Sequence, residues 1–269
     1  MSTRNSLRPE LNQLFKELRL PAMRQNLDEL LRQAEQGSFS YERFALELLR
    51  RESEARRIKR IGRYMDDSRL PMEKNLEAFE LERLPRKAVQ QTRSLLEGHF
   101  LDRREAVLVF GNPGTGKSHL LCAIGQHLVR EHQRRVYFTT CALLVQELLV
   151  AKRDLRLKRL MKKFSKYEAI IVDDIGYVQQ SREEMEVLFT LLGERYEHGS
   201  VMITSNLPFS KWEKIFKDPM TTAAVIDRLI HHSVIIELNI PSYRLEHHKK
   251  ARNRSKTARG GKSHAAAVL

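Results

Sequence analysis

A strand, a glycine-rich loop and a helix are predicted in succession near the middle of the chain, and this succession most restricts how the chain folds. The loop reads Gly111-Asn112-Pro113-Gly114-Thr115-Gly116-Lys117-Ser118. An apolar run at 106–110 precedes it, and apolar residues at helical spacing follow it over 120–128. Glycines let backbone N–H groups approach a polyphosphate, and a helix N-terminus adds a partial positive charge. The motif therefore predicts a nucleoside triphosphate site, the alternative being an ordinary glycine-rich turn.

Side chains at the end of this loop have predicted roles in that site. Lys117 is expected to reach the β- and γ-phosphates, and the Ser118 hydroxyl is expected to coordinate Mg²⁺. We include the next residue, His119, among the nucleotide contacts.

Two carboxylates, Asp173 and Asp174, end a later apolar run at 169–172. Ligands of open parallel sheets bind at the carboxyl ends of the strands, so both acids are expected to face the phosphates. Asp173 is predicted to hold Mg²⁺, directly or through water, and Asp174 to act as general base on the attacking water. Alone, two aspartates at the end of an apolar strand are weak evidence for a nucleotide site, but downstream of a phosphate loop they are strong evidence.

Further strands are predicted at 136–140, 201–204 and 234–238, alternating with helices at 143–150, 181–196 and 223–229. This alternation indicates a parallel sheet covered on both faces. Asn206 follows the strand at 201–204, where its amide can orient water against the γ-phosphate. The alternative is that Asn206 only starts the turn before Pro208.

The composition favours a polyanionic partner. The 269 residues include 48 Lys and Arg against 34 Asp and Glu, a formal net charge of +14, which points to nucleic acid. No apolar run approaches membrane-spanning length, and the polar N-terminus has no signal-peptide core, so we expect a cytoplasmic protein without membrane contact. The two cysteines, Cys122 and Cys141, are predicted to be buried and reduced.

The first part of the chain is predicted to be a small all-helical domain at 1–68, connected through a stretch around Pro71 to a nucleotide-binding domain at 69–248. Three amphipathic helices are expected before residue 68, the third capped by Ser40. The third helix is basic over 50–63, but Glu52 and Glu54 can pair with its cations. Contact with nucleic acid or a partner and a merely solvated face therefore both stay open for this helix.

A second basic stretch lies inside the nucleotide-binding domain. We predict one helix over 152–166 whose apolar residues face inward and whose cations face outward with Asp154 as the only acid. The cations predicted to contact DNA are Lys152, Arg153, Arg156, Lys158, Arg159, Lys162 and Lys163. Residues 249–269 are predicted to be a disordered basic tail that adds DNA affinity. For both segments, the alternative is a solubilising surface without a role in binding.

The combined pattern resembles the AAA+ ATPases of the DnaC/IstB group. The resemblance covers about residues 76–244 and rests on the phosphate loop, the Asp173-Asp174 strand and three further segments. These are Thr204-Ser205-Asn206-Leu207-Pro208-Phe209, Asp227-Arg228-Leu229 and Ser242-Tyr243-Arg244. The double aspartate and the Leu-Pro-Phe sequence look more like IstB, the transposition helper of insertion sequences, than like the helicase loader DnaC.

This resemblance implies a fold and further site residues. The fold would be an α/β AAA+ P-loop core with a five-stranded parallel sheet and no full C-terminal lid. The phosphate loop would be the Walker A motif, Asp173-Asp174 the Walker B pair and Asn206 sensor 1. Arg228 would be an arginine finger inserted into a neighbouring subunit, and Arg244 a reduced sensor 2. The group often has Gly-Glu before Ser-Tyr-Arg, whereas this chain has Ile240-Pro241.

The resemblance also implies a function. The leading hypothesis is a regulator of DNA transposition that uses ATP and Mg²⁺, oligomerises on double-stranded DNA with little sequence preference, presents the DNA to a transposase and disassembles on hydrolysis. A replicative helicase loader with the same ATPase core is the first alternative. A small-molecule P-loop kinase and a non-enzymatic DNA-architectural protein are two further alternatives.

Overall fold

The computed structural model describes residues 4–176, 181–212, 223, 226, 227, 229–243 and 245. The chain divides into two compact units, residues 1–63 and 64–269, and the border between them falls within helix α3. Each unit is described by itself below.

The first unit is built from α1 (Arg4–Glu17), α2 (Pro21–Gln36) and the larger part of α3 (Tyr41–Ser68). Its small core is formed by five buried apolar side chains, Phe15, Met23, Leu27, Leu30 and Leu48. The Ser40 hydroxyl accepts a hydrogen bond from the Arg43 N–H (3.2 Å) at the start of α3. The three predicted helices and the predicted cap are therefore confirmed.

A buried carboxylate joins α3 to the start of α2. The backbone N–H groups of Ala22 and Met23 donate to Glu52 Oε2 (2.8 and 3.0 Å), and Arg56 Nε donates to Glu52 Oε1 (2.9 Å). Burial acts to raise the pKa of Glu52, but these hydrogen bonds and the Arg56 charge hold it below its ordinary value. Glu52 thus satisfies N–H groups that the first turn of α2 leaves without helical partners.

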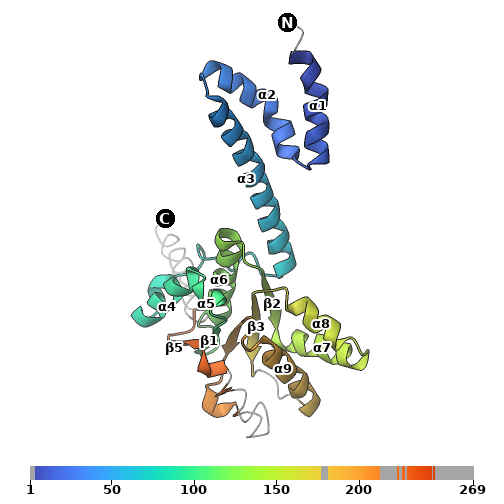
Figure 1. Ribbon diagram of the computed structural model, residues 1–269. Helices are drawn as coiled ribbons and strands as arrows, with labels where there is room; N and C mark the ends of the chain where they lie inside the picture. The colour runs from blue at the N-terminus through green and yellow to red at the C-terminus, as the bar shows by residue number, and fades with distance from the viewer. Residues whose placement is uncertain are drawn as a thin grey trace, which may run out of the picture. The chain divides into compact units, whose positions relative to one another are not determined.

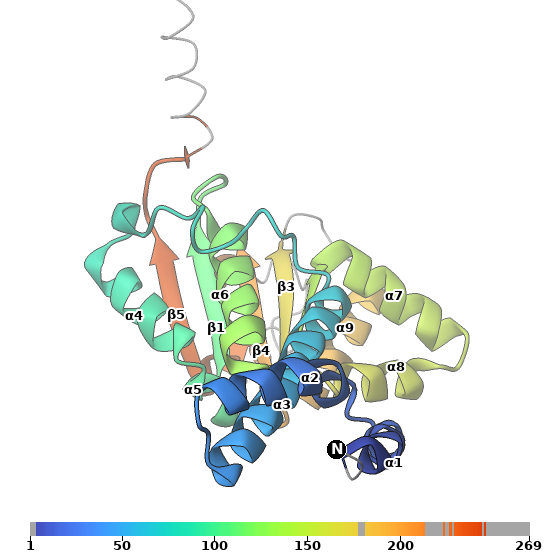
Figure 2. The same cartoon turned by 90° about the horizontal axis from the view of Figure 1, so that it is seen from above.

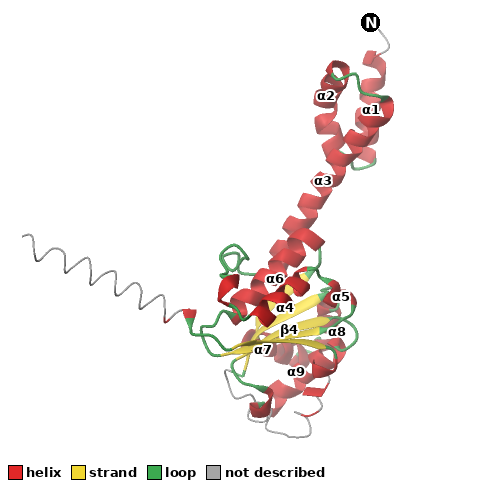
Figure 3. Ribbon diagram, turned by 90° about the vertical axis from the view of Figure 1, so that its left-hand side faces the viewer, coloured by secondary structure: helices red, strands yellow, loops and turns green. Residues whose placement is uncertain are grey.

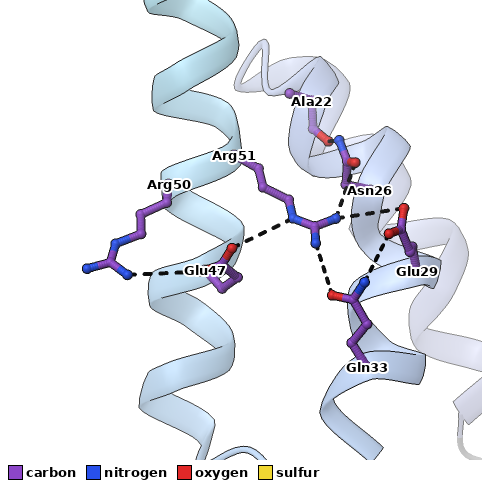
Figure 4. A network of polar contacts seen from close by, with 7 residues as sticks. All are labelled: Ala22, Asn26, Glu29, Gln33, Glu47, Arg50 and Arg51. Carbon is purple, nitrogen blue, oxygen red and sulfur yellow. Dashed lines mark hydrogen bonds and ion pairs between the residues drawn. The ribbon is translucent and has the colours of Figure 1, made fainter. Parts of the chain in front are cut away.

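The basic stretch of α3 is largely paired within this unit. Arg51 lies between the two helices, where it donates to Asn26 Oδ1 (3.3 Å) and Gln33 Oε1 (3.0 Å) and lies near the carboxylates of Glu29 and Glu47 (Figure 4). Further along the helix, Arg57 pairs with Glu54 (3.5 Å). Of the two possibilities left open for this helix, pairing of its cations with acids of the same unit is therefore observed for Arg51 and Arg57.

The second unit contains a five-stranded sheet and the helices that cover it (Figure 1). After the end of α3, the described elements are, in chain order, η1 (Leu81–Arg83), α4 (Arg86–Leu96), α5 (His99–Asp102), β1 (Ala106–Gly111), α6 (Lys117–His132), β2 (Val136–Thr140), α7 (Cys141–Arg153), α8 (Leu157–Phe164), β3 (Ala169–Ile175), α9 (Arg182–Arg195), β4 (Ser200–Ser205), η2 (Phe209–Lys211) and β5 (Ser233–Leu238).

The sheet has the order β2-β3-β4-β1-β5, and all of its neighbouring strands are parallel. Side chains alternate between two cores: Val107 and Val109 pack with α6, whereas Leu108 and Phe110 belong to the core that contains α7, α8 and α9. Figure 2 shows α4 and α6 in front of the sheet, and Figure 3 shows the sheet between α4 and α6 above it and α9 below it. The five parallel strands and the two-sided cover are confirmed.

The segment between α3 and η1 lies against α6. Leu70 is buried, and Gln126 Nε2 donates to the carbonyls of Pro71 (2.8 Å) and Lys74 (3.1 Å). The sequence around Pro71 is therefore an ordered segment of the second unit that lies against the middle of the phosphate-loop helix.

The prediction of one helix over 152–166 is wrong. Helix α7 ends at Arg153 and α8 begins at Leu157, and the intervening Leu155 is 93% exposed with φ of 56°. The prediction of almost no neutralising acid is also wrong, because Glu147 pairs with Lys163 (3.3 Å), and Glu186 pairs with Lys152 (3.1 Å). Glu147 lies shortly before the basic stretch on α7 and Glu186 lies on α9, and the packing of α8 and α9 against α7 brings these acids to Lys163 and Lys152.

Other predictions have different outcomes. Cys122 and Cys141 are buried free thiols, as predicted. The helix predicted at 181–196 is confirmed as α9, and a capping box opens it, since the side chains of Ser181 and Glu184 each accept from the other's backbone N–H. Only part of the helix predicted at 223–229 is described, and the basic tail at 249–269 lies outside the described residues. Among the described helices, none combines the length and the apolar character needed to cross a membrane.

Candidate nucleotide site

The phosphate loop connects β1 to α6 at the carboxyl edge of the sheet. Gly114 and Gly116 adopt φ of 82° and 94°, a region that favours glycine. A side chain at Gly116 would approach the Phe79 ring (3.1 Å), and one at Gly114 would collide with Ser242. The loop therefore requires glycine at both positions, and the N-terminus of α6, which has 16 residues, opens into it.

Lys117 is buried, with 6% exposure, and its ammonium group lies at the centre of the site. Lys117 Nζ donates to the carbonyl of Asn112 (3.0 Å) and to Oδ1 of Asn206 (2.6 Å). Asn112 O also accepts from the Thr115 hydroxyl (2.9 Å). An ammonium group buried beside the phosphate loop is suited to an anionic ligand, because its hydrogen bonds to the oxygens of a phosphate are strengthened by the opposite charges.

An irregularity in the sheet places the two aspartates. The β3–β4 register shifts between Val172 and Ile175, so that Asp173 and Asp174 together oppose Thr204. The Thr204 hydroxyl donates to Asp173 Oδ1 (2.7 Å) and accepts from the backbone N–H of Asp174 (2.7 Å). In a regular strand, neighbouring side chains point to opposite faces. The bulge, with Asp174 at φ of 62°, instead leaves both carboxylates beside residues of the β4 end.

Asn206 connects the second aspartate to the phosphate loop. Its Nδ2 donates to Asp174 Oδ1 (2.8 Å), while its Oδ1 accepts from Lys117. Burial and the nearby Asp173 raise the pKa of Asp174, and Lys117 and the Asn206 hydrogen bond act in the opposite direction. The structure thus joins Lys117, Asn206 and Asp174, from three separate elements, into one polar chain, and Asn206 does more than start a turn.

Two further segments border the phosphate loop. His119 Nε2 lies 2.9 Å from the carbonyl of Asn75, and its ring meets the Phe79 ring edge-on (5.1 Å between centroids). After β5, the backbone N–H of Tyr243 donates to Gly114 O (2.9 Å), and Arg83 lies over the Tyr243 ring (4.9 Å). The segment after β5, in which Ile240-Pro241 depart from the family pattern, therefore lies directly against the phosphate loop.

The structure brings together most, but not all, of the predicted site residues. The loop residues, Ser118, both aspartates and Asn206 gather at one edge of the sheet, while Arg228 and Arg244 lie outside the described residues. The cations predicted to contact DNA lie on α7, α8 and the turn between them, a separate part of the unit. Among them, Lys152, Arg153 and Lys163 have acidic partners, and the other four make no ion pair with a described residue.

Sequence reasoning missed two residues of the site. Thr204 reads as an ordinary strand residue, and only its place two residues before Asn206 could have drawn attention to it. Phe79 stands more than thirty residues before Gly116, and no local pattern connects the two.

Together, the parallel sheet, the glycine loop with its buried lysine and the carboxylates at the neighbouring strand end define an ATP-binding P-loop protein of the AAA+ class. The comparisons with known proteins agree. The chain belongs to the family of IstB-like ATP binding proteins, whose model matches residues 13–251.

Relatives and solved structures support this assignment. An insertion sequence ATP-binding protein of Sinorhizobium fredii is 39% identical over 232 residues, which cover 86% of this chain and 78% of the relative. The insertion sequence IS21 ATP-binding protein of Pseudomonas aeruginosa is 35% identical over 245 residues, or 90% of this chain and 91% of the relative. The DnaC helicase loader has a similar structure (TM-score 0.54, 66% of this chain and 99% of that one), and at 17% identity this likeness concerns the fold alone.

Proposed function

We propose that this protein is an ATPase that regulates DNA transposition. It binds ATP, assembles with further copies of itself on duplex DNA, presents that DNA to a transposase and disassembles when ATP is hydrolysed. Two insertion sequence relatives that align with most of the chain support the link to transposition. The observation that carries the ATPase is the polar chain from Lys117 through Asn206 to Asp174.

The residues of the site fit ATP and Mg²⁺. The loop provides N–H groups and Lys117 for the phosphates, and Ser118 and Asp173 provide hydroxyl and carboxylate oxygens for Mg²⁺. Among the described residues, no three His, Cys, Asp or Glu side chains are grouped to bind a metal by themselves. Such a sparse donor set suits Mg²⁺, which keeps several waters and shares its coordination with phosphate oxygens.

Binding and hydrolysis would use different contacts of the same side chains. Phosphate oxygens replace the carbonyl of Asn112 and the amide of Asn206 as acceptors from Lys117. Asn206 then has its Oδ1 free to orient a water, and Asp174, held by the other end of the amide, accepts a proton from that water. As the proton of the attacking water moves to the Asp174 carboxylate, the water oxygen would bond to the γ-phosphorus, the bond from this phosphorus to the β–γ bridging oxygen would break, and ADP would leave.

Two arginines would complete the site. Arg228 would enter the nucleotide site of a neighbouring subunit, and Arg244 would contact nucleotide in its own subunit. An arginine supplied in this way contributes about 10³–10⁵ in rate, so a lone subunit would be a slow ATPase. Both assignments rest on the resemblance, and the Arg244 assignment has the added support that the backbone N–H of its neighbour Tyr243 donates to Gly114 O.

The turn between α7 and α8, with α8 itself, is the surface we assign to DNA. Its exposed cations without an acidic partner among the described residues are Arg156, Lys158, Arg159 and Lys162, and Lys166, two residues after the end of α8, extends this surface. We expect these to bind phosphates with little sequence preference, since phosphate contacts carry no sequence information. The helical residues 1–68 and the basic tail at 249–269 would add partner or DNA contacts to the ATPase domain at 69–248.

The assembly and its partner can be tested together. Full-length protein is mixed with ATP, Mg²⁺ and duplex DNA, and both hydrolysis and particle mass are followed. We expect DNA to accelerate turnover and to raise the mass, and Asp174→Asn to bind ATP but to remain assembled on DNA. A monomer that hydrolyses ATP at full rate would contradict the proposal, as would a phosphorylated metabolite as product.

Capture of the transposase or of the replicative helicase by the Asp174→Asn assembly then identifies the partner. Transposase retention supports the transposition role, whereas helicase retention alone would make the protein a helicase loader. The Lys117→Ala variant is the matched control, because it should bind neither ATP nor the partner.

A further inference from the structure

Leu155 occupies a position in the α7–α8 turn where glycine is usual. The N–H of Leu155 donates to Lys152 O (3.1 Å), and the N–H of Arg156 donates to Ala151 O (2.7 Å). This pair of bonds is the Schellman arrangement that ends many helices, and its left-handed residue is most often glycine. Leucine adopts this conformation reluctantly, because its Cβ crowds the following carbonyl. The identity of this residue is therefore not explained by the helix end.

Packing does not explain Leu155 either. Its side chain is 93% exposed, whereas Leu160 and Phe164 of α8 are buried and anchor that helix to the core. Leu157 and Met161 also pack against this core, and Leu155 does not belong to it. Single exposed leucines are common on protein surfaces. An exposed leucine in a hydrogen-bonded turn, with a backbone conformation that leucine disfavours, is less common.

Most of the charged residues near this leucine in the sequence are cations. Asp154 precedes it and pairs with Arg153 (3.6 Å). Arg156 follows it, Lys158 and Arg159 lie on the first turn of α8 and Lys162 on the second, and these four cations are exposed and without an acidic partner among the described residues. Arg159 and Lys162 also line a groove between α7 and α8. An apolar tip with cations around it matches duplex DNA, in which the phosphates flank stacked base pairs.

We propose that Leu155 is a wedge that enters between adjacent base pairs of duplex DNA while the α8 cations hold the phosphates on either side. This inference rests on the proposed DNA binding and adds its mode. Apolar wedges of this kind partly unstack a base step and kink the duplex. Since the wedge reads no base edge, it agrees with binding of low sequence preference. Each subunit of an assembly would add a kink, so the DNA presented to the partner would be bent.

The variant Leu155→Gly distinguishes a role of Leu155 as a DNA wedge from a role in the stability of the fold. Glycine suits the left-handed position at the end of α7, so the variant should melt no lower than the wild type, while the wedge is absent. Leu155→Met keeps a long apolar side chain and is the conservative control. The full-length proteins are compared with Mg²⁺ and a non-hydrolysable ATP analogue. The duplexes carry either a fluorophore pair at their ends or 2-aminopurine within a repeated sequence.

We expect the wild type and Leu155→Met to bring the duplex ends closer, measured by energy transfer, and to raise 2-aminopurine fluorescence. Leu155→Gly should lose most of both signals but keep the salt dependence of binding, which reports phosphate contacts. Equal bending and unstacking by Leu155→Gly would overturn the wedge. Normal bending together with loss of transposase capture would overturn it too, and would make Leu155 a protein contact.

The test also distinguishes the wedge from the DNA binding on which it rests. A variant with glutamine at Lys158 and Lys162 should bind DNA with a flatter salt dependence, while the duplex that remains bound is still unstacked. A wild-type protein without affinity for duplex DNA would overturn both ideas. A wild-type protein that binds tightly without bending would overturn the wedge alone.

Discussion

Replacing Thr204 with valine tests how the aspartates are positioned. The side chain is fully buried, and valine has nearly the same shape, so the substitution removes the hydroxyl and little else. Two short hydrogen bonds are lost, one to the Asp173 carboxylate and one from the Asp174 N–H. The register shift of the sheet gives this N–H no regular partner on β4.

The cost follows from the two lost bonds. A bond to a charged acceptor contributes about 1.5–3 kcal/mol, and a buried N–H without a partner costs about 1–3 kcal/mol. We therefore expect a loss of about 3 kcal/mol in the free energy of unfolding, or roughly 6–12 °C in melting temperature for a domain of this size. Since Asp173 loses its donor, the Mg²⁺ concentration needed for half-maximal ATP hydrolysis should also rise.

Calorimetry and a Mg²⁺ titration of the ATPase measure the two effects. Thr204→Ser retains the oxygen and should recover the Mg²⁺ dependence, although it loses a methyl group. A valine variant with the melting temperature and the Mg²⁺ dependence of the wild type would refute the reasoning. A lower melting temperature with unchanged Mg²⁺ dependence would limit Thr204 to a structural role.

Three further predictions concern other groups. Lys117→Ala should abolish ATP binding measured by calorimetry, and wild-type affinity would remove the lysine from the site. Asn206→Ala removes a bond that lowers the raised pKa of Asp174, so the acid limb of the ATPase pH profile should move to higher pH; an unmoved limb would exclude Asp174 as the titrating base. The pKa of Glu52 is lowered in the folded protein. Its contribution to the free energy of unfolding is therefore complete above the ordinary pKa of 4.5 and is lost as the pH falls through the folded-state pKa. Glu52→Gln should therefore lower the melting temperature of the first unit at pH 7 and show less further loss than the wild type on acidification.

Local patterns in the sequence were enough to predict the strands, the phosphate loop and the two aspartates of this protein. Apolar runs of strand length, separated by amphipathic helices, predicted the five strands because burial on both faces of a parallel sheet demands continuous apolar residues. The phosphate loop was predictable because its glycines and the helix start after it act through the local backbone, and its lysine and serine follow at a fixed spacing. Both aspartates followed from their place at the end of a buried strand.

Contacts between residues remote in sequence were decided only by the tertiary structure. The cations at 152–166 suggested one helix without neutralising acids, but a turn divides this segment into two helices. Glu147 of α7 pairs with Lys163, and Glu186 of α9 pairs with Lys152. Ion pairing depends on distance in space, and a pattern of spacing within one segment contains no information on it.

The site itself shows the same division. Its residue types were evident from the chain, but the bulge that turns Asp173 and Asp174 to the same edge arises from the pairing of β3 with β4, and Thr204 acts only through that pairing. The sequence determined which groups are present and on which strand each one ends. The packing of the strands against one another determined which groups share hydrogen bonds, because these bonds require atoms within about 3 Å, and only the folded sheet brings those atoms together.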